Sequence, residues 1–428
     1  GYTKINLSGA SLRNKRILFA FGNFQLFDFD LKYFIDNSEK DPVDTEIAVP
    51  PTTGSQKVSF ASIDPKPQNI TVDSDGNWLA KYYLKPGQNL EITVKGQVKI
   101  TSVDPKKTDD PPSADLIKED KYWPVSDSSI ALIAQNLNTP RQIYDYVVKT
   151  LNYNYNFGST VKRQGALEAL LNPDTALCTE FTDLFVTLAR AKGIPAREVE
   201  GFAYTNNPKI KPVNQGTDIL HAWPQYYEHA KSRWISVDPT WEKTTNGIDY
   251  FSDLDLNHFA FVIHGHDSQY PSPPGSYKNN KDIKTVNINF ATEELKSSQV
   301  PPSLEFEKTD FRQDPSLVIS NTDINSIDNI IISFPQNNWQ YQIKTLPPFG
   351  RQKINFPRLP FFTSILPKYQ KISFEVLYNN SDYPVYQSSV YLPHYLNLAI
   401  TIIVSIFILS LGGIILTVQK TNHHEKIT

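Results

Sequence analysis

The spacing of hydrophobic and polar residues divides this chain into a β-rich beginning, a mixed centre and a second β-rich stretch. Short apolar runs separated by turn residues predict strands up to about residue 120. These strands are Arg16–Phe21, Lys57–Ile63, Trp78–Leu84 and Leu90–Ile100. The last run alternates apolar and polar residues, as a half-solvated strand does. Similar runs from about residue 283 to 392 predict a second β-sandwich.

The hydrophobic period changes in the centre of the chain. Apolar residues at steps of three and four between residues 127 and 152 predict helices, the second of them opened by Thr139 and Pro140. Another helix is predicted from the four residues Phe181, Leu184, Phe185 and Leu188. We expect Asp174 or Thr175 to cap its start, and Glu180 and Asp183 to supply solvated negative charge in its first turns. Helices mixed with strands over 178–265 indicate an α+β core.

An apolar run near the C-terminus, from Leu396 to Val418, contains no charged residue. At about 1.5 Å per residue it would reach roughly 34 Å, enough to cross a hydrocarbon core of about 30 Å. The run predicts one transmembrane helix over 393–419 and a cytoplasmic tail over 420–428. The bulk of the chain would then be extracytoplasmic at the cell membrane.

Composition narrows the classes of function. The 428 residues carry 42 Lys and Arg against 45 Asp and Glu, a net charge of −3, which argues against a nucleic-acid partner. One Cys excludes an internal disulfide and a zinc site built on several cysteines. The chain has no Met, so we expect a processed or truncated N-terminus from which a signal peptide would be missing.

The only cysteine, Cys178, falls at the predicted start of the central helix. Free N–H groups and the helix dipole at such a position favour a thiolate. A nucleophilic cysteine needs a base, and the base needs a group to orient it. His221 in HAWPQYYE and Asp238 in RWISVDPTW lie on two predicted strands joined by the short EHAKS connection. A hairpin there would bring His221 and Asp238 together, within a register error of one or two residues.

Cys at a helix start, then GIPAR, HAW and VDPT, resembles the transglutaminase-like superfamily, whose core is related to papain-type cysteine proteases. The resemblance covers about residues 127–265. It implies Cys178 as the nucleophile, His221 as base and acid, and Asp238 as the group that fixes the imidazole tautomer. The wider layout resembles membrane-anchored bacterial or archaeal members of that superfamily.

The predicted fold class is therefore an α+β transglutaminase-like (papain-like) core flanked by two β-sandwich-type domains, with one C-terminal transmembrane helix. The predicted segments are an N-terminal β-rich domain over 1–120, the core over 121–268 and a C-terminal β-sandwich-like domain over 269–392. The transmembrane helix over 393–419 and the tail over 420–428 follow.

Further site residues are expected around the three catalytic candidates. The backbone N–H of Cys178 is one oxyanion donor, and Tyr153 or Tyr155 is a second donor by analogy. Trp223, Gln225 and Trp241 are expected to line the site. The superfamily often has an acidic residue soon after HAW, where this chain has Gln225. We expect this difference to change the electrostatics of the site.

The leading hypothesis is a membrane-anchored, extracytoplasmic enzyme that transfers acyl groups from protein or peptide amides through a thioester. The sequence leaves open whether water or an amine resolves the thioester. The alternative is a catalytically silent binding or scaffold protein at the cell surface, favoured by Gln225. No cofactor and no metal are inferred, because His264 and His266 in HGHD are expected to lie in a solvated loop. The oligomeric state cannot be inferred.

Overall fold

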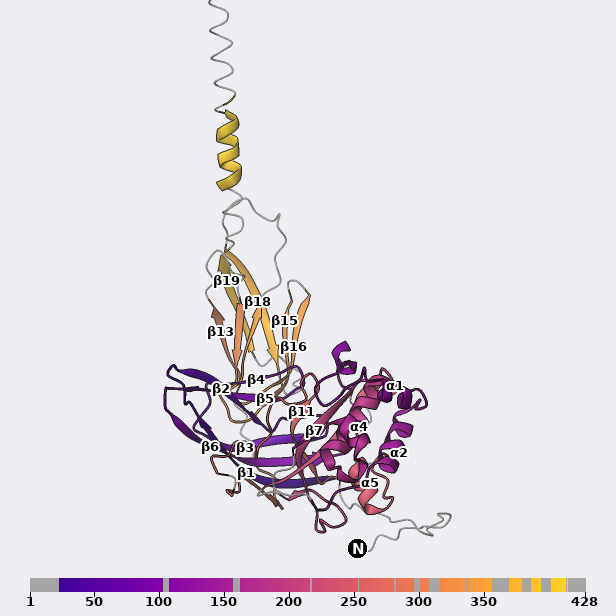
Figure 1. The fold of residues 1–428 in the computed structure, drawn as a ribbon. Coiled ribbons are helices and arrows are strands. Elements are labelled where there is room, and N and C mark those ends of the chain that lie inside the picture. Colours follow the sequence, from indigo (N-terminus) through magenta and orange to yellow (C-terminus); the bar gives the residue numbers. More distant parts are fainter. Residues whose placement is uncertain are drawn as a thin grey trace, which may run out of the picture. The chain divides into compact units, whose positions relative to one another are not determined.

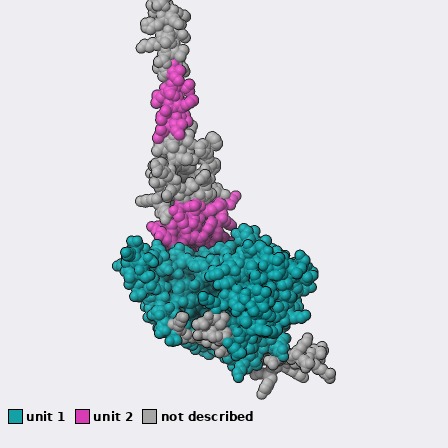
Figure 2. Space-filling model, viewed as in Figure 1, with its two compact units in different colours: residues 1–297 teal, residues 298–428 magenta. Residues whose placement is uncertain are grey.

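The structure, a computed structural model, describes most of the first 300 residues and parts of the remainder. It divides the chain into two compact units, Gly1–Ser297 and Ser298–Thr428 (Figures 1 and 2). The described residues are 23–102, 108–156, 162–215, 218–252, 254–280, 282–295, 301–307, 316–335, 338–355, 369–378, 386–393, 402–412 and 414. The predicted strand Arg16–Phe21 lies outside them.

Two antiparallel sheets form the N-terminal part of the first unit. One has the strand order β12-β1-β6-β3 and the other the order β2-β5-β4. Their bounds are β1 Phe24–Asp36, β2 Val43–Val49, β3 Gln56–Asp64, β4 Asn69–Val72, β5 Trp78–Leu84, β6 Asn89–Thr101 and β12 Val286–Phe290. The strands predicted at residues 57–63, 78–84 and 90–100 are thus confirmed. Strand β12, from the segment expected to form the C-terminal domain, pairs with β1.

Alternation along the strands builds the core between these sheets. Phe27, Phe29, Leu31 and Tyr33 of β1 are all buried. The Tyr33 hydroxyl donates to the carbonyl of Ala48 in β2 at 2.9 Å, and the ring of Phe60 in β3 packs against Trp78 in β5. Side chains that alternate along each strand therefore join the two sheets.

The central part of the first unit combines a five-stranded sheet with helices. The strand order is β10-β9-β7-β11, with β8 paired to β9. The strands are β7 Ala196–Ala203, β8 Asn214–Gln215, β9 Ile219–Glu228, β10 Arg233–Ser236 and β11 His258–His264. The α-helices are α1 Ser128–Ala134, α2 Pro140–Thr150, α3 Ala166–Leu171, α4 Cys178–Ala191 and α5 Pro239–Thr245. Short 3₁₀ turns are η1 Ala114–Ile117, η2 Pro173–Thr175 and η3 His229–Lys231.

Helix α4 is the centre of the main hydrophobic cluster. Its predicted stripe, Phe181, Leu184, Phe185 and Leu188, is fully buried. The cluster also takes side chains from α2 and α3 and, from β9, Tyr226. Figure 1 shows α1, α2, α4 and α5 gathered beside β7. Thr139 caps α2 by accepting from the N–H of Gln142, as its sequence predicts.

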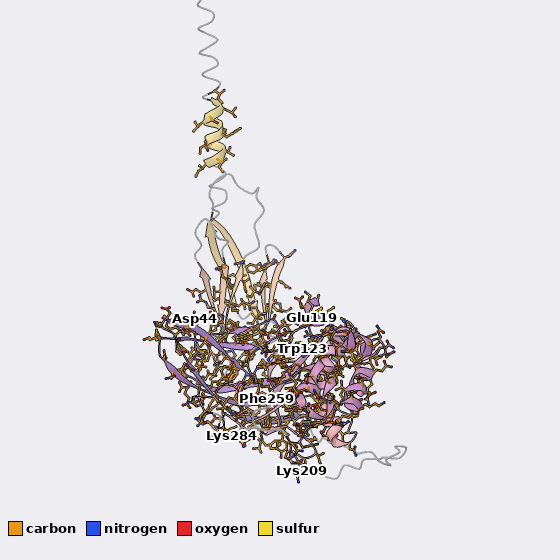
Figure 3. All side chains as sticks on the ribbon, viewed as in Figure 1. Asp44, Glu119, Trp123, Lys209, Phe259 and Lys284 are labelled. Atoms are coloured by element: carbon orange, nitrogen blue, oxygen red, sulfur yellow. The ribbon has the colours of Figure 1, made fainter. Side chains whose placement is uncertain are left out.

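The N-terminal sheets pack against the outer strand β11 of the central sheet. Val262 of β11 shares a cluster with Ala48 and Leu79, and the ring of Phe259 packs on Phe29. Figure 3 labels Phe259 and Trp123, both buried, inside this unit. Helices therefore pack on the central sheet, and the N-terminal sheets pack against its outer strand β11.

The second unit contains two antiparallel sheets with one shared core. The strand orders are β13-β14-β17 and β16-β15-β18-β19. The strands are β13 Ser303–Glu307, β14 Ser316–Ser320, β15 Ile327–Phe334, β16 Trp339–Leu346, β17 Arg351–Asn355, β18 Tyr369–Leu377 and β19 Tyr386–Pro393. Leu317 of β14, Ile332 of β15 and Phe374 of β18 lie in the same buried cluster. The alternation of Ile330, Ile332 and Phe334 along β15 supplies much of that core.

The prediction of a transmembrane helix over 393–419 is wrong. No helix formed by the described residues is long and apolar enough to cross a membrane. Apart from 393, 402–412 and 414, the residues of the predicted segment lie outside the described residues, as does the tail at 420–428. The membrane, extracytoplasmic and cytoplasmic-tail assignments, which depended on that helix, are therefore withdrawn.

Gly201 is required where β7 runs between β9 and β11. It pairs with His221 on one side and with Ala260 on the other. A Cβ atom at this position would lie 2.0 Å from the Phe259 carbonyl oxygen and 3.0 Å from the Ala260 Cα. Both neighbours are backbone atoms, so they cannot turn aside as a flexible side chain would.

We expect Gly201→Ala to lower the free energy of unfolding by about 1–3 kcal/mol, as overpacking does. Gly54→Ala is the matched control, because its Cβ would meet Asp109 Oδ1 at an ordinary 3.6 Å. Urea unfolding of the three proteins measures the difference. Equal midpoints for Gly201→Ala and Gly54→Ala would contradict the close approach at β7.

Candidate active site

Cys178 is the first residue of α4 and is 5% exposed. The predicted cap, Asp174 or Thr175, is wrong, because those residues form the separate turn η2. Glu180 stabilises the helix start instead: its carboxylate accepts from the N–H of Leu177 at 2.9 Å and from that of Gln164 at 2.9 Å. The sulfur therefore lies at a buried helix N-terminus whose geometry is fixed by an acidic side chain.

His221 lies near the start of β9 and is buried. The backbone opposite it in β7 belongs to Gly201, which has no side chain. The ring of Trp241 stacks on the imidazole at a centroid distance of 5.0 Å, and that of Trp223 lies at 6.0 Å. Both predicted site-lining tryptophans thus surround the imidazole.

Asp238 follows β10 and caps α5. Its Oδ1 accepts from the N–H of Trp241 at 3.0 Å, and its Oδ2 lies 2.9 Å from His221 Nε2. The hairpin between β9 and β10 forms, although its register differs by two residues from one that would place Asp238 directly opposite His221. Asp238 still reaches His221 because it lies beyond the strand end, at the turn into α5.

The attraction between His221 and Asp238 dominates the pKa values of both side chains. Burial alone lowers the pKa of His221, but the charge and hydrogen bond of Asp238, followed by the influence of Cys178, raise it to about 9. Burial raises the pKa of Asp238, but His221 and then His258 hold it well below its usual range. Asp238 is therefore the ionised partner of a charged imidazole at neutral pH.

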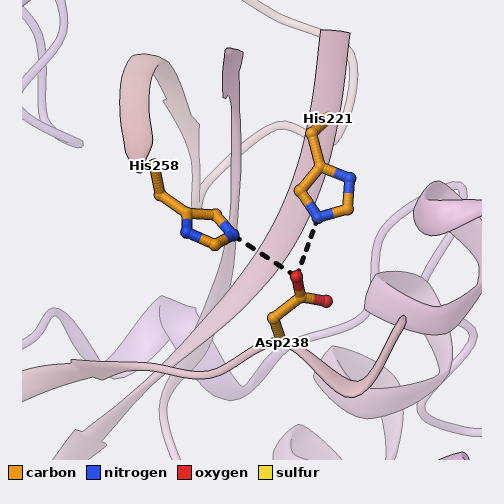
Figure 4. A group of neighbouring side chains, drawn as sticks. All are labelled: His221, Asp238 and His258. Atoms are coloured by element: carbon orange, nitrogen blue, oxygen red, sulfur yellow. Dashed lines mark hydrogen bonds and ion pairs between the residues drawn. The ribbon is translucent and has the colours of Figure 1, made fainter. Parts of the chain in front are cut away.

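The second nitrogen of the His221 ring is the one available to sulfur. Nδ1 is buried and has no hydrogen-bond partner with standard geometry among the described residues. Cys178 is nevertheless close enough to raise the pKa of the ring. Figure 4 shows Nε2 directed at Asp238 and the other ring nitrogen turned away from it. One nitrogen of the imidazole is thus bound to Asp238, and the other carries a proton that no acceptor among the described residues takes with standard geometry.

The two tyrosines proposed from the sequence lie at different depths. Tyr153 forms a β-bridge with Ala176, two residues before the cysteine. Burial, then the charge of Cys178, raise the pKa of its phenol. Tyr155 is 51% exposed and packs edge-on against the Tyr153 ring at 5.0 Å.

Gln225 lies away from the three catalytic candidates. Its amide oxygen accepts from Arg197 Nε at 2.8 Å, and its amide nitrogen donates to the Ser236 hydroxyl at 2.8 Å. The side chain belongs to a cavity on the far side of Trp223, described below.

His258, Asp255 and Lys211 extend the site and were not predicted from the sequence. His258 Nε2 lies 3.3 Å from Asp238 Oδ2, and its Nδ1 lies 2.9 Å from Asp255 Oδ1. Lys211 Nζ lies 3.1 Å from Asp255 Oδ2. Figure 4 shows His221 and His258 approaching the same carboxylate oxygen from two sides. His258 was missed because it begins the uniformly apolar strand HFAFVIH, and only the acid three residues earlier hints at its role.

A separate buried cluster of charges surrounds Arg163. This guanidinium pairs with Asp183 and, at 2.9 Å, with Glu198 Oε2. His264 Nδ1 lies 3.0 Å from the same Glu198 oxygen. Burial, only partly offset by Arg163, raises the pKa of Asp183 to about 7. The expectation that Glu180 and Asp183 are solvated, and that His264 lies in a solvated loop, is therefore wrong.

Two groups of side chains place ligand-type atoms within 4.8 Å of one another: Glu198, Glu200 and His264, and His221, Asp238 and His258. In the first group Arg163 already neutralises Glu198. In the second group the Asp238 oxygen already binds both imidazoles. The hydrogen bonds and ion pairs account for both groupings, so we assign a metal to neither.

Comparisons with known proteins agree with the motif order. Residues 127–239 match the family model of the transglutaminase-like superfamily. Uncharacterized proteins from Mycobacterium tuberculosis and Mycobacterium bovis are 32% identical over 92 residues, 21% of this chain and 29% of those proteins. The match thus spans less than a third of the length of these curated relatives.

Three solved structures are also similar in part. A protein from Cytophaga hutchinsonii described as a "Putative Cysteine Protease" is 16% identical, with a TM-score of 0.40 over 65% of this chain and 94% of that one. The periplasmic domain of TgpA from Pseudomonas aeruginosa is 15% identical, with a TM-score of 0.27 over 54% and 98%. Red sea bream transglutaminase is 11% identical, with a TM-score of 0.23 over 85% and 80%.

The matched residues include Cys178, His221 and Asp238. The chain therefore contains a transglutaminase-like domain.

Proposed function

We propose that the transglutaminase-like domain is a cysteine-dependent enzyme that transfers acyl groups from protein or peptide amides, with Cys178, His221 and Asp238 as its catalytic residues. One observation carries the proposal: Asp238 holds His221 Nε2 at 2.9 Å, and Cys178, at the start of α4, also raises the pKa of the same ring. A thiol, an imidazole and an ionised acid in this order are what nucleophilic cysteine chemistry requires.

The first half of the reaction follows from these positions. Because His221 is charged at neutral pH, the proton of the pair lies on the imidazole and Cys178 acts as a thiolate that attacks the amide carbonyl carbon. His221 then gives its Nδ1 proton to the departing amine as the C–N bond breaks, which leaves a thioester on Cys178. Asp238 stays ionised throughout, because His221 and His258 hold its pKa well below its usual range.

The second half resolves the thioester. Water or an amine attacks the thioester carbonyl, His221 takes a proton from the attacking group, and the acyl group leaves as the C–S bond breaks, which restores the thiolate beside the charged imidazole. Water gives hydrolysis and an amine gives amide exchange. The negative oxygen formed in both halves would accept hydrogen bonds from the backbone N–H of Cys178 and from the hydroxyl of Tyr153.

The alternative of a silent scaffold was motivated by Gln225. That side chain bonds Arg197 and Ser236 and none of the three proposed catalytic residues. Having Gln225 in place of an acidic residue therefore leaves the hydrogen bond between His221 and Asp238 intact. This observation favours the enzyme.

His258 acts as a positioning residue in this proposal. It bridges Asp238 and Asp255, and Lys211 neutralises the second carboxylate. Burial lowers the pKa of His258, but Asp255, and Asp238 after it, raise it to about 9. The charged ring shares the Oδ2 atom that orients His221, so it fixes where the carboxylate lies.

The central pair is tested by alkylating Cys178 with iodoacetamide at pH 6.5. Because the chain has one cysteine, mass spectrometry reports a single site. We expect His221→Ala to slow labelling by on the order of 10- to 100-fold, since the thiolate loses its charged partner. His229→Ala, at an exposed position, is the control and should label like the parent. Equal rates in the parent and His221→Ala would exclude an activated pair.

The raised pKa values predict how stability depends on pH. His221 and His258 bind protons more tightly in the folded state, near 9, than at their ordinary value of 6.5. Their contribution to stability is therefore complete below pH 6.5 and is lost as the pH rises through about 9. We expect the unfolding free energy of the parent to fall over this window.

His258→Gln should reduce that fall by on the order of 1–3 kcal/mol. Urea unfolding at pH 6, 7.5 and 9 measures the dependence, and the slope is compared rather than the absolute stability. His229→Gln is the matched control and should keep the slope of the parent. An unchanged slope in His258→Gln would mean that this imidazole is not held charged between the two acids.

A further inference from the structure

A cavity of about 70 Å³ lies between the loop at residues 53–56 and the central sheet. The loop belongs to the N-terminal sheets, and the other walls come from β7, β9, β10 and the region of β11. Its lining is mainly polar and aromatic, and includes Gln56, Arg197, Gln225, Trp234, Ser236 and His258. His258 connects this cavity to the back of the candidate active site, because its ring also contacts Asp238.

Arg197 is held in a fixed orientation at this cavity. It lies opposite Gln225 in the pairing of β7 with β9. Its Nε donates to Gln225 Oε1 at 2.8 Å, and its guanidinium stacks over the Trp234 ring at 3.9 Å. The Gln225 amide is itself fixed, because it donates to the Ser236 hydroxyl. The orientation of the Arg197 guanidinium is therefore fixed before any ligand binds.

The hydrogen-bond partner of the Arg197 side chain is the neutral amide of Gln225 rather than an acidic side chain. In the described part of the chain, Arg197 forms no ion pair, and Nη1 and Nη2 make no hydrogen bond. Burial lowers the pKa of Arg197 to about 10, while Asp75, Asp109 and Asp73 act from farther away. The guanidinium is thus charged at neutral pH, in a partly buried site where an unpaired charge is costly.

The free edge of the guanidinium carries two nitrogens whose geometry matches a carboxylate. Asp109 also lines the cavity, and its Oδ2 accepts from the N–H of Trp234 at 2.9 Å. Its negative charge would repel a doubly charged phosphate more strongly than a singly charged carboxylate. The cavity is large enough for several water molecules, since about 10–15 Å³ of this kind of volume holds one, and so for an ion with one or two carbon atoms.

We propose that this cavity is a binding site for a small carboxylate, held by the outer edge of Arg197 with Trp234 behind the guanidinium and Gln225 beside it. The site is separate from the proposed catalytic residues, and its occupancy does not require acyl transfer. A failure of the proposed function would therefore leave this inference standing, and the reverse also holds.

The test is ¹⁹F NMR line broadening of difluoroacetate by the full chain, at pH 7 and constant ionic strength. We expect saturable broadening by the parent and at least fivefold weaker binding by Arg197→Gln. Gln225→Glu should weaken binding equally, because it gives Arg197 an internal carboxylate 2.8 Å from Nε in place of the amide. Arg141→Gln removes an exposed arginine that is paired with Asp145 and Asp249, and should leave binding unchanged.

Competition separates the two sources of a carboxylate. If acetate displaces the probe and a capped glutamyl amide does not, the ligand is a free small anion. If both compounds displace it, the site also binds an acidic side chain. Both results support the site. Parental binding in Gln225→Glu would overturn it, as would an equal loss in Arg141→Gln. Arg197→Gln also removes the stacking on Trp234, so a loss of binding in that variant is ambiguous. The Gln225→Glu result therefore decides whether Arg197 binds the carboxylate.

The same substitution gives a second readout without any ligand. We expect Gln225→Glu to raise the melting temperature by about 2–4 °C, because it pairs a charge that is already buried. Gln225→Asn, with a shorter neutral amide, is the control and should not raise it. A lower melting temperature in Gln225→Glu would mean that the Arg197 charge is already compensated.

Discussion

The carboxylate of Asp238 is the group on which the arrangement of this site depends. One oxygen accepts from the N–H of Trp241 and so begins α5, and the other accepts from both His221 and His258. A buried carboxylate is stable only if its acceptors are satisfied. Removing this one group would leave two charged imidazoles without their shared partner and would uncap a helix. Local folding and the proposed chemistry therefore rest on the same atoms.

Much of the first unit follows from local patterns in the sequence. The stripe of Phe181, Leu184, Phe185 and Leu188 predicted α4 because helical spacing is decided by neighbours a few residues away. The hairpin that carries His221 was predicted for the same reason, from two alternating runs and a short polar connection. The transglutaminase-like resemblance, carried by four short strings, agrees with the match over residues 127–239.

What the sequence could not supply depends on distant segments. Asp183 and Glu180 looked solvated because their helix positions were read alone, yet Arg163 and Gln164 cover them. His258 joins Asp238 only because β11 lies beside β7 in the sheet, an order that no local period encodes. The apolar run near residue 400 predicted a spanning helix from hydropathy alone, and no helix among the described residues is long and apolar enough to cross a membrane.

The N-terminal sheets complete the surroundings of the central sheet. Gln56 hydrogen-bonds to both the N–H and the carbonyl of Ala260 in β11, and Asn77 does the same for Ile263. These contacts fix the strand that carries His258, and their loop forms one wall of the cavity at Arg197. The domain beyond the matched residues thus shapes the back of the site.

The most direct test of the central claim is the titration of His221 by ¹⁵N NMR of its ring nitrogens, in the parent and in Cys178→Ala. The account predicts a pKa of about 9 in the parent and a lower value in Cys178→Ala, because both Asp238 and the sulfur stabilise the charged ring. A pKa at or below 6.5, unchanged when the sulfur is removed, would contradict it.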